Sequence, residues 1–234
     1  MKRLLATIIK DIVLQARYGF YFATLFVAAI YIAILRQIPS VSLSYVLPYL
    51  MVSNLMITAY FFLAGQILFE KGEGTLEAMI VTPVRSAEFL LSKTISLALL
   101  GIIEGLLLVV ASFGLKFNFL YFAIALLLLA VLMILLGFIV VARYDSINEF
   151  ILPGVVFMMP LSLPFIDYFE LWTSWIFDLH PVQLPLQLMR FALDPQAPGP
   201  SLLATVATGL WITGLFRWAQ TAFGRFIIRK GSRQ

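Results

Sequence analysis

The sequence predicts an all-α integral membrane protein with six transmembrane helices, and two features of its composition carry that prediction. Hydrophobic residues occupy 62% of the 234 positions and charged residues only 12%, whereas a soluble domain carries roughly 25% charged residues. The mean hydropathy is +1.01. Because so few polar side chains are available to cover a water-exposed surface, most of the chain must face lipid. We expect a single membrane domain over residues 1–234.

Six segments are long and apolar enough to cross a bilayer, which takes about 20 residues. They are residues 18–35, 43–69, 94–115, 119–142, 147–166 and 201–221. The first is short, and the second is long enough to tilt. The fifth contains Pro153, Pro160 and Pro164, so we expect a kink or break there, with neighbouring helices satisfying the carbonyl groups that it leaves unpaired.

Residues 1–17 precede the first span and show the period of a helix, about 3.6 residues. Their apolar side is formed by Leu4, Leu5, Ile8, Ile9, Ile12, Val13 and Ala16. The other side carries Lys2, Arg3, Lys10, Asp11, Gln15 and Arg17. We expect an interfacial helix with its apolar face in lipid and its basic face toward the headgroups. A signal peptide is excluded because charges recur along the segment and no small-residue cleavage site follows.

The positions of lysine and arginine predict the orientation of the chain. With the N-terminus in the cytoplasm, 13 of the 16 basic residues are cytoplasmic, and only Arg36, Lys116 and Arg190 are outside. This asymmetry follows the positive-inside rule and places both termini in the cytoplasm. We therefore expect a multi-pass protein of the cytoplasmic membrane. Because the basic residues flank hydrophobic segments, the net charge of +4 does not indicate a nucleic-acid partner.

The sequence lacks the residues of common catalytic and metal sites. It contains no cysteine, which excludes disulfides, thiolate metal sites and cysteine nucleophiles. It also contains no G-x-x-x-x-G-K-[ST], no H-E-x-x-H and no G-x-S-x-G motif. The single histidine, His180, has no second imidazole to share a metal and is interpreted as a loop or interfacial residue. We predict that the chain is not an enzyme and holds no cofactor or metal.

The expected outer loop, residues 167–200, is long and rich in aromatic side chains that suit the membrane–water boundary. These are Tyr168, Phe169, Trp172, Trp175 and Phe177. We expect short interfacial or re-entrant helices there, ended by the turn-forming residues 194–200 before the last span.

The cytoplasmic loop, residues 70–93, is the most informative segment. Gly72 and Gly74 interrupt the helix of the second span as it leaves the membrane. An apolar edge with i, i+3, i+4 spacing follows, with Glu77 near the positive N-terminus of a short helix. That edge is formed by Leu76, Met79 and Ile80. These features predict a short amphipathic helix that lies parallel to the membrane and faces the cytosol.

Further along the same loop, Thr82-Pro83 ends this helix or opens the next one, because proline is favoured in a first helical turn. Ser86 followed by Glu88 resembles a helix N-cap with an acid in the first turn.

The loop resembles the coupling loop of the ABC type-2 transporter permeases. The shared pattern is an acid and a base at the membrane exit, Gly-Thr-Leu-Glu, an apolar turn, Thr-Pro, and then an acid and a lysine. The matching residues are Glu70, Lys71, Gly74, Thr75, Leu76, Glu77, Met79, Thr82, Pro83, Glu88 and Lys93. The layout is similar as well, with an interfacial N-terminal helix, six spans and an outer re-entrant region before the last span. The alternative is an ordinary solvated hairpin between two spans.

The resemblance implies a permease subunit of an ATP-binding cassette exporter. In such a transporter the loop docks in a groove of a separate ABC ATPase subunit, which binds the ATP and magnesium. It also implies a second permease copy or a homologous permease, with membrane lipid around both. We expect export, because nothing in the sequence resembles an importer's docking apparatus for a binding protein. Because the spans contain few polar residues, we expect a hydrophobic or amphipathic substrate such as a drug, a lipid-like molecule or a glycan-lipid. One alternative is an ATP-independent secondary transporter or channel, for which only Glu104 is available as a midplane ligand. The other is a membrane assembly scaffold.

The third span contains a Gly101-x-x-x-Gly105 pair, which lets neighbouring helices approach closely. Between the two glycines lies Glu104, near the middle of the membrane, where a charge costs about 2.5–3.5 kcal/mol unless it is paired or hydrated. Three alternatives remain for Glu104: a protonated carboxyl that hydrogen-bonds to a neighbouring helix, a residue of the transport path, or an acid paired with a base.

A second cytoplasmic turn, residues 142–149, is too short for a large docking surface. Ser146 and Glu149 match a capping box, which predicts the start of a helix. Arg143 and Tyr144 are candidate contacts with an ATPase.

Overall fold

The computed structural model describes residues 2–75 and 86–228. All regular elements in these ranges are helical. In chain order they are α1 (Lys2–Arg17), α2 (Phe20–Leu35), α3 (Ser40–Gly72), α5 (Ser86–Ser112), α6 (Phe119–Val141), α7 (Ile147–Met158), η1 (Met159–Ser162), α8 (Pro164–Tyr168), η2 (Trp175–Leu179), α9 (Gln183–Leu193), α10 (Leu202–Ala222) and η3 (Phe223–Ile228). Among the described residues, five helices are long and apolar enough to cross a membrane, or six if the bent pair α1–α2 is one span. The predicted fold class, an all-α membrane protein, is confirmed.

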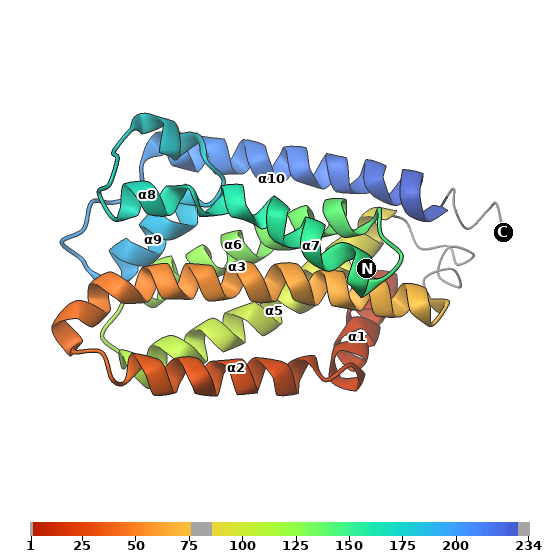
Figure 1. Ribbon diagram of the computed structural model, residues 1–234, viewed down its shortest axis with the longest axis horizontal. Coiled ribbons are helices and arrows are strands. Elements are labelled where there is room, and N and C mark those ends of the chain that lie inside the picture. The colour runs from red at the N-terminus through yellow and green to blue at the C-terminus, as the bar shows by residue number, and fades with distance from the viewer. Residues whose placement is uncertain (1, 76–85, 229–234) are drawn as a thin grey trace.

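The long helices run side by side between the two ends of a bundle (Figure 1). Helix α1, the end of α3, the start of α5 and the C-terminal end of α10 lie at one end, which we call the loop end. Helices α8 and α9 lie at the other end, which we call the far end.

Helix α6 forms the centre of the bundle and packs against α3, α5, α9 and α10. It is the most hydrophobic and the most buried of the candidate spans. Its Gly137 lies so close to α3 that an added Cβ would be 3.1 Å from the backbone oxygen of Tyr60. A small residue is therefore what lets α3 and α6 approach closely at this crossing.

Helices α1 and α2 meet at an angle of 63°. Gly19 supplies the turn between them with φ of +77°, in the left-handed region that favours glycine. Leu5, Ile9 and Val13 of α1 are exposed, as a lipid-facing side requires. Its polar side differs from the expectation, because Asp11 and Gln15 are buried against α3 and α5 rather than turned to headgroups.

Two spans extend further into the predicted loop of residues 70–93 than hydropathy indicates. Helix α3 continues to Gly72 and α5 begins at Ser86, whereas the predicted spans end at residue 69 and begin at residue 94. The reason is that Glu70 and Lys93 are paired inside the protein, so these charges do not mark the edge of the bundle.

The fifth span is broken, as its prolines predict. Helix α7 ends at Met158, and a 3₁₀ turn that contains Pro160 leads into α8, which begins with Pro164. Pro153 is accommodated inside α7. The capping box at the start of α7 is also confirmed, since Ser146 Oγ accepts a hydrogen bond from the Glu149 N–H.

The far end is built on α9, which is largely buried and packs against α6. The N–H of Asn118, at the start of α6, donates to the carbonyl of Ala192 in α9 at 2.8 Å. Tyr168 at the end of α8 donates its hydroxyl to the carbonyl of Tyr45 in α3 at 2.6 Å. These contacts fix the segment that precedes α10 to the bundle.

Candidate functional site

The two ends of the 70–93 loop meet inside the protein. Lys93 Nζ of α5 donates to Glu70 Oε1 of α3 and, at 2.6 Å, to Asp11 Oδ1 of α1. Their side chains are nearly inaccessible, at 0% for Lys93, 1% for Glu70 and 2% for Asp11. One buried ammonium group therefore joins three helices.

Polar side chains surround this ion triad and bond to it. Gln66 Nε2 donates to Asp11 Oδ1 and to Glu70 Oε1, both at 3.3 Å. Ser92 Oγ donates to Asp11 Oδ2 at 2.6 Å. Gln15 Nε2 donates to Ser96 Oγ at 2.9 Å and reaches Gln66 Oε1 at 3.4 Å. We call the set the buried charge cluster; it comprises Asp11, Gln15, Gln66, Glu70, Ser92, Lys93 and Ser96.

The energetics of the cluster demand a fixed geometry. It holds two carboxylates against one ammonium group, and removing charges from water costs several kcal/mol each unless their partners are well placed. Glu70 Oε2 is buried without a hydrogen-bond partner among the described residues. A relative shift of α1, α3 or α5 would leave a buried charge without its partner. The cluster therefore holds these helices in register.

Outside the cluster, Lys71 connects the end of α3 to the turn between α6 and α7. Its Nζ donates to the carbonyls of Ala142 at 3.1 Å and Tyr144 at 2.6 Å, and lies 3.7 Å from the carboxylate of Asp145. The turn of residues 142–149, the predicted second contact with an ATPase, is therefore bonded to the residue at the start of the 70–93 loop.

The next residues lead out of the bundle. Gly74 has φ of +67°, which favours glycine, and Thr75 Oγ1 donates to the carbonyl of Glu70 at 3.2 Å. After the loop, Glu88 lies in the first turn of α5, where an acid complements the helix dipole. The other predicted coupling residues lie outside the described residues: Leu76, Glu77, Met79, Thr82 and Pro83.

Glu104 is in a different part of the bundle and is 2% exposed. Its Oε1 accepts a hydrogen bond from Asn54 Nδ2 of α3 at 2.8 Å. The neighbouring glycines make close contacts: an added Cβ would lie 2.7 Å from Leu55 at Gly101 and 2.7 Å from Leu126 at Gly105. Gly101 thus faces α3 and Gly105 faces α6, and none of the three residues bonds to the buried charge cluster.

Two apolar hollows open on the sides of the bundle. The first, of about 420 Å³, lies between α3 and the broken α7–α8 span. It is lined by Tyr49, Ser53, Met56, Ile57, Phe61, Val155, Met158, Met159, Ser162 and Phe165. The Ser53 hydroxyl is buried without a hydrogen-bond partner among the described residues. We call this hollow the α3–α7 groove.

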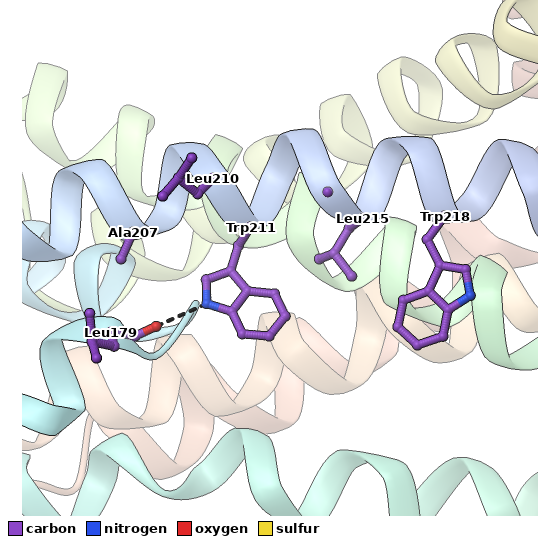
Figure 2. Close-up of a pocket in the computed structure, with 7 residues that line it drawn as sticks. Leu179, Ala207, Leu210, Trp211, Leu215 and Trp218 are labelled. Atoms are coloured by element: carbon purple, nitrogen blue, oxygen red, sulfur yellow. Dashed lines mark hydrogen bonds between the residues drawn. The ribbon is translucent and has the colours of Figure 1, made fainter.

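The second hollow, of about 540 Å³, lies along α10. Figure 2 shows Trp211 and Trp218 on the same side of this helix, with the indole of Trp211 turned toward η2. Trp211 Nε1 donates to the carbonyl of Leu179 at 2.9 Å (Figure 2). The indole therefore attaches the last span to the far-end segment and forms one wall of the hollow.

His180 follows η2 and bonds within the far end. Its Nδ1 accepts a hydrogen bond from the N–H of Val182 at 3.3 Å, so its proton is on Nε2, beside the carbonyl of Pro160. Burial lowers the pKa of His180 to about 4. The imidazole is therefore neutral near pH 7 and has a structural place, in agreement with its interpretation as a loop residue.

Four buried polar residues of the site were not predicted from the sequence: Asp11, Gln15, Gln66 and Asn54. For α1 a signal was present, because Thr7, Asp11 and Gln15 repeat every four residues and form a polar stripe. For α3 the signal was an amide or carboxyl within a long apolar segment, which is costly in a membrane without a partner. No group of three or more potential metal ligands occurs in the described ranges.

Comparison of the sequence with known proteins identifies a family. Residues 2–231 match the profile of the fluoroquinolones export permease protein family. The chain is 31% identical to the fluoroquinolones export permease proteins of two Mycobacterium tuberculosis strains, CDC 1551 / Oshkosh and ATCC 25618 / H37Rv; each match covers 98% of both chains. These relatives are permeases, so the predictions of a transport subunit rather than an enzyme, and of an ABC-type exporter permease, are confirmed. The chain belongs to the fluoroquinolones export permease protein family.

Proposed function

We propose that this permease exports planar, aromatic, amphipathic drugs and is driven by a separate ABC ATPase that docks on the 70–93 loop. The observation that carries the proposal is the buried charge cluster at the root of the loop. Glu70 and Lys93 border the loop, and Lys93 binds both Glu70 and Asp11 of α1.

The cluster offers a route for mechanical coupling. An ATPase that pushes on the loop applies force to the ends of α3 and α5. Because the ion triad resists separation of its charges, α1 moves with them as one unit. Lys71 extends the connection to the α6–α7 turn. A small displacement of the loop is thus converted into a movement of several spans, as rigid packed elements require.

The substrate class is supported by the α3–α7 groove. Its walls combine aromatic rings and methionines, and adaptable methionine surfaces accept varied apolar ligands. Its volume of about 420 Å³ lies within the range of drug-binding pockets, roughly 300–1,000 Å³. The buried Ser53 hydroxyl supplies one polar contact. The relatives are named for fluoroquinolone export, and a fused aromatic ring system suits such walls.

The assembly we propose contains two permease copies and two ATPases in the cytoplasmic membrane, with the loop end in the cytosol. The orientation is supported by the basic residues, which are concentrated on the side of the 70–93 loop. Single cysteines test it, because the chain has none of its own. Gln196→Cys should react with an impermeant maleimide in intact cells and Glu73→Cys should not; the reverse pattern would overturn the orientation.

Co-purification tests the ATPase partner. Tagged permease should retain a co-expressed P-loop ATPase, and the double variant Leu76→Asp/Met79→Asp should retain at least about tenfold less, since losing a central apolar contact typically costs more than 1 kcal/mol. Glu77→Lys should act in the same direction by reversing a charge at the docking edge. The matched control is Glu170→Lys, a charge reversal at an exposed residue of the far end. If the loop variants retain the ATPase at the wild-type level, the loop is an ordinary hairpin and does not bind the ATPase.

An ATP-independent secondary transporter is the competing function. It would need an ion ligand that can exchange with the transport path. Glu104 is the candidate, but its carboxyl is buried and bonded to Asn54, and it does not line either apolar hollow. The geometry of the described residues therefore favours an ATP-driven transporter over an ion-driven one.

A further inference from the structure

A polar pocket of about 220 Å³ lies at the far end, between α8, α9 and residues 198–201. It is separate from the loop, the charge cluster and both apolar hollows. Its walls include one acid, Asp167, one base, Arg190, and the side-chain amides of Gln183 and Gln187. Pockets for whole drugs are roughly 300–1,000 Å³, so this one suits a small polar group.

The two opposite charges in the pocket are held apart. Asp167 Oδ2 accepts a hydrogen bond from Gln183 Nε2 at 2.8 Å. The Arg190 guanidinium lies over the ring of Tyr168, 5.4 Å from its centre. Within the described ranges no ion pair joins Asp167 to Arg190. Each charge thus has a neutral partner but no opposite charge, and a ligand that carries both signs would supply one to each.

The two side-chain amides of the pocket differ in whether all their polar atoms have hydrogen-bond partners. Gln187 is satisfied on both sides, since its Nε2 donates to Asp178 at 2.8 Å and its Oε1 accepts from the Ser201 N–H at 3.0 Å. Gln183 is only 4% exposed, and its Oε1 is buried without a partner among the described residues. The unused acceptor belongs to the same amide that holds Asp167. A ligand N–H group that reaches Asp167 from the pocket would lie beside this amide.

We propose that this pocket binds a compact zwitterion. Its ammonium group would lie at Asp167, beside the Gln183 amide. Its acid group, a phosphate or carboxylate, would pair with Arg190, whose planar guanidinium suits either anion. The phosphoethanolamine head of a membrane lipid and a small soluble zwitterion share this chemistry. The site is independent of the drug-binding groove.

The test uses the purified full chain and native mass spectrometry with three lipids that have the same acyl chains. Phosphatidylethanolamine carries both groups, phosphatidylcholine has no ammonium N–H, and phosphatidylglycerol has no cation. We expect phosphatidylethanolamine to bind about tenfold more tightly than either, the effect of one charge-assisted hydrogen bond. Arg190→Gln and Asp167→Asn should each abolish the preference, and Asp167→Asn keeps the oxygen that accepts from Gln183. Lys116→Gln, which removes an exposed charge elsewhere on the chain, should retain it.

Competition with glycerophosphoethanolamine identifies the source of the ligand. Displacement of phosphatidylethanolamine by this soluble head group assigns the pocket to a soluble zwitterion, and resistance to displacement assigns it to the lipid; both results uphold zwitterion binding. Equal binding of the three lipids by the wild-type chain would overturn the proposal without reference to any variant. So would a preference for phosphatidylethanolamine that persists in Arg190→Gln and Asp167→Asn.

Discussion

Replacing Lys93 by methionine removes the only ammonium group of the buried charge cluster while keeping much of the side chain's length. Asp11 and Glu70 are then left as buried carboxylates without their cation. Removing one partner from a buried ion pair costs about 3–5 kcal/mol. For chains of this size each kcal/mol lowers Tm by about 2–4 °C, so we expect Lys93→Met to lower Tm by about 6–20 °C.

Thermal unfolding of the purified full chain in detergent measures this effect. The matched control is Lys10→Met, the same substitution at an exposed residue of α1, which should stay within about 0.5 kcal/mol of the wild type. A second comparison isolates charge from packing. In the triple variant Lys93→Met/Glu70→Gln/Asp11→Asn no charge is left unpaired, so part of the lost stability should return.

Two results would refute this reasoning. If Lys93→Met lowers Tm no more than Lys10→Met, the ammonium group is not a buried partner of the two acids. If the triple variant is as unstable as the sum of its three single substitutions, the losses come from packing and not from the pairing of charges.

Three further perturbations test other contacts by thermal unfolding. Gly105→Ala should lower the free energy of unfolding by about 1–3 kcal/mol, because its Cβ would lie 2.7 Å from the buried Leu126. Its control, Gly214→Ala, has open space at the Cβ and should be neutral or stabilising. Equal effects of the two substitutions would contradict the close approach of α5 and α6. Glu104→Gln keeps the oxygen that accepts from Asn54 and should have near-normal stability. Glu104→Ala should lose about 1–3 kcal/mol of stability, because it leaves the Asn54 amide unpaired. Normal stability of both variants with transport lost in both would place Glu104 in the transport path. The pKa of His180 in the folded protein, about 4, is below its ordinary 6.5, so its contribution to stability is complete above about pH 6.5 and declines as pH falls toward 4. His180→Gln should flatten that part of the Tm–pH curve, and an unchanged slope would contradict its burial.

Local features of the fold were accessible from the sequence because each has a local cause. Apolar length predicts a span, proline at position 160 predicts a break, and a serine three residues before a glutamate predicts a helix start at Ser146. Each of these depends on residues that are neighbours along the chain, and each is found in the structure.

The buried charge cluster was not accessible in the same way. Amphipathic periodicity divides α1 into two sides, but it does not say whether the polar side meets water or another helix. Asp11 and Lys93 are 82 positions apart, and nothing local pairs them. Hydropathy also began the predicted third span only after the charge of Lys93, although a helix can continue past a charge that is paired inside the bundle. The polar far-end pocket likewise depends on contacts between segments that are apart in the sequence, such as the bond between Gln183 and Asp167.

In the function proposed for this permease, ATP hydrolysis by a partner chain drives export. The most direct measurement is fluoroquinolone uptake into inside-out membrane vesicles that contain the permease and its P-loop ATPase. We predict uptake that requires ATP, fails with a non-hydrolysable analogue, persists when an uncoupler collapses the proton gradient, and falls in the variant Leu76→Asp/Met79→Asp. Uptake by the permease alone that is driven by a proton gradient and is indifferent to ATP would contradict the claim.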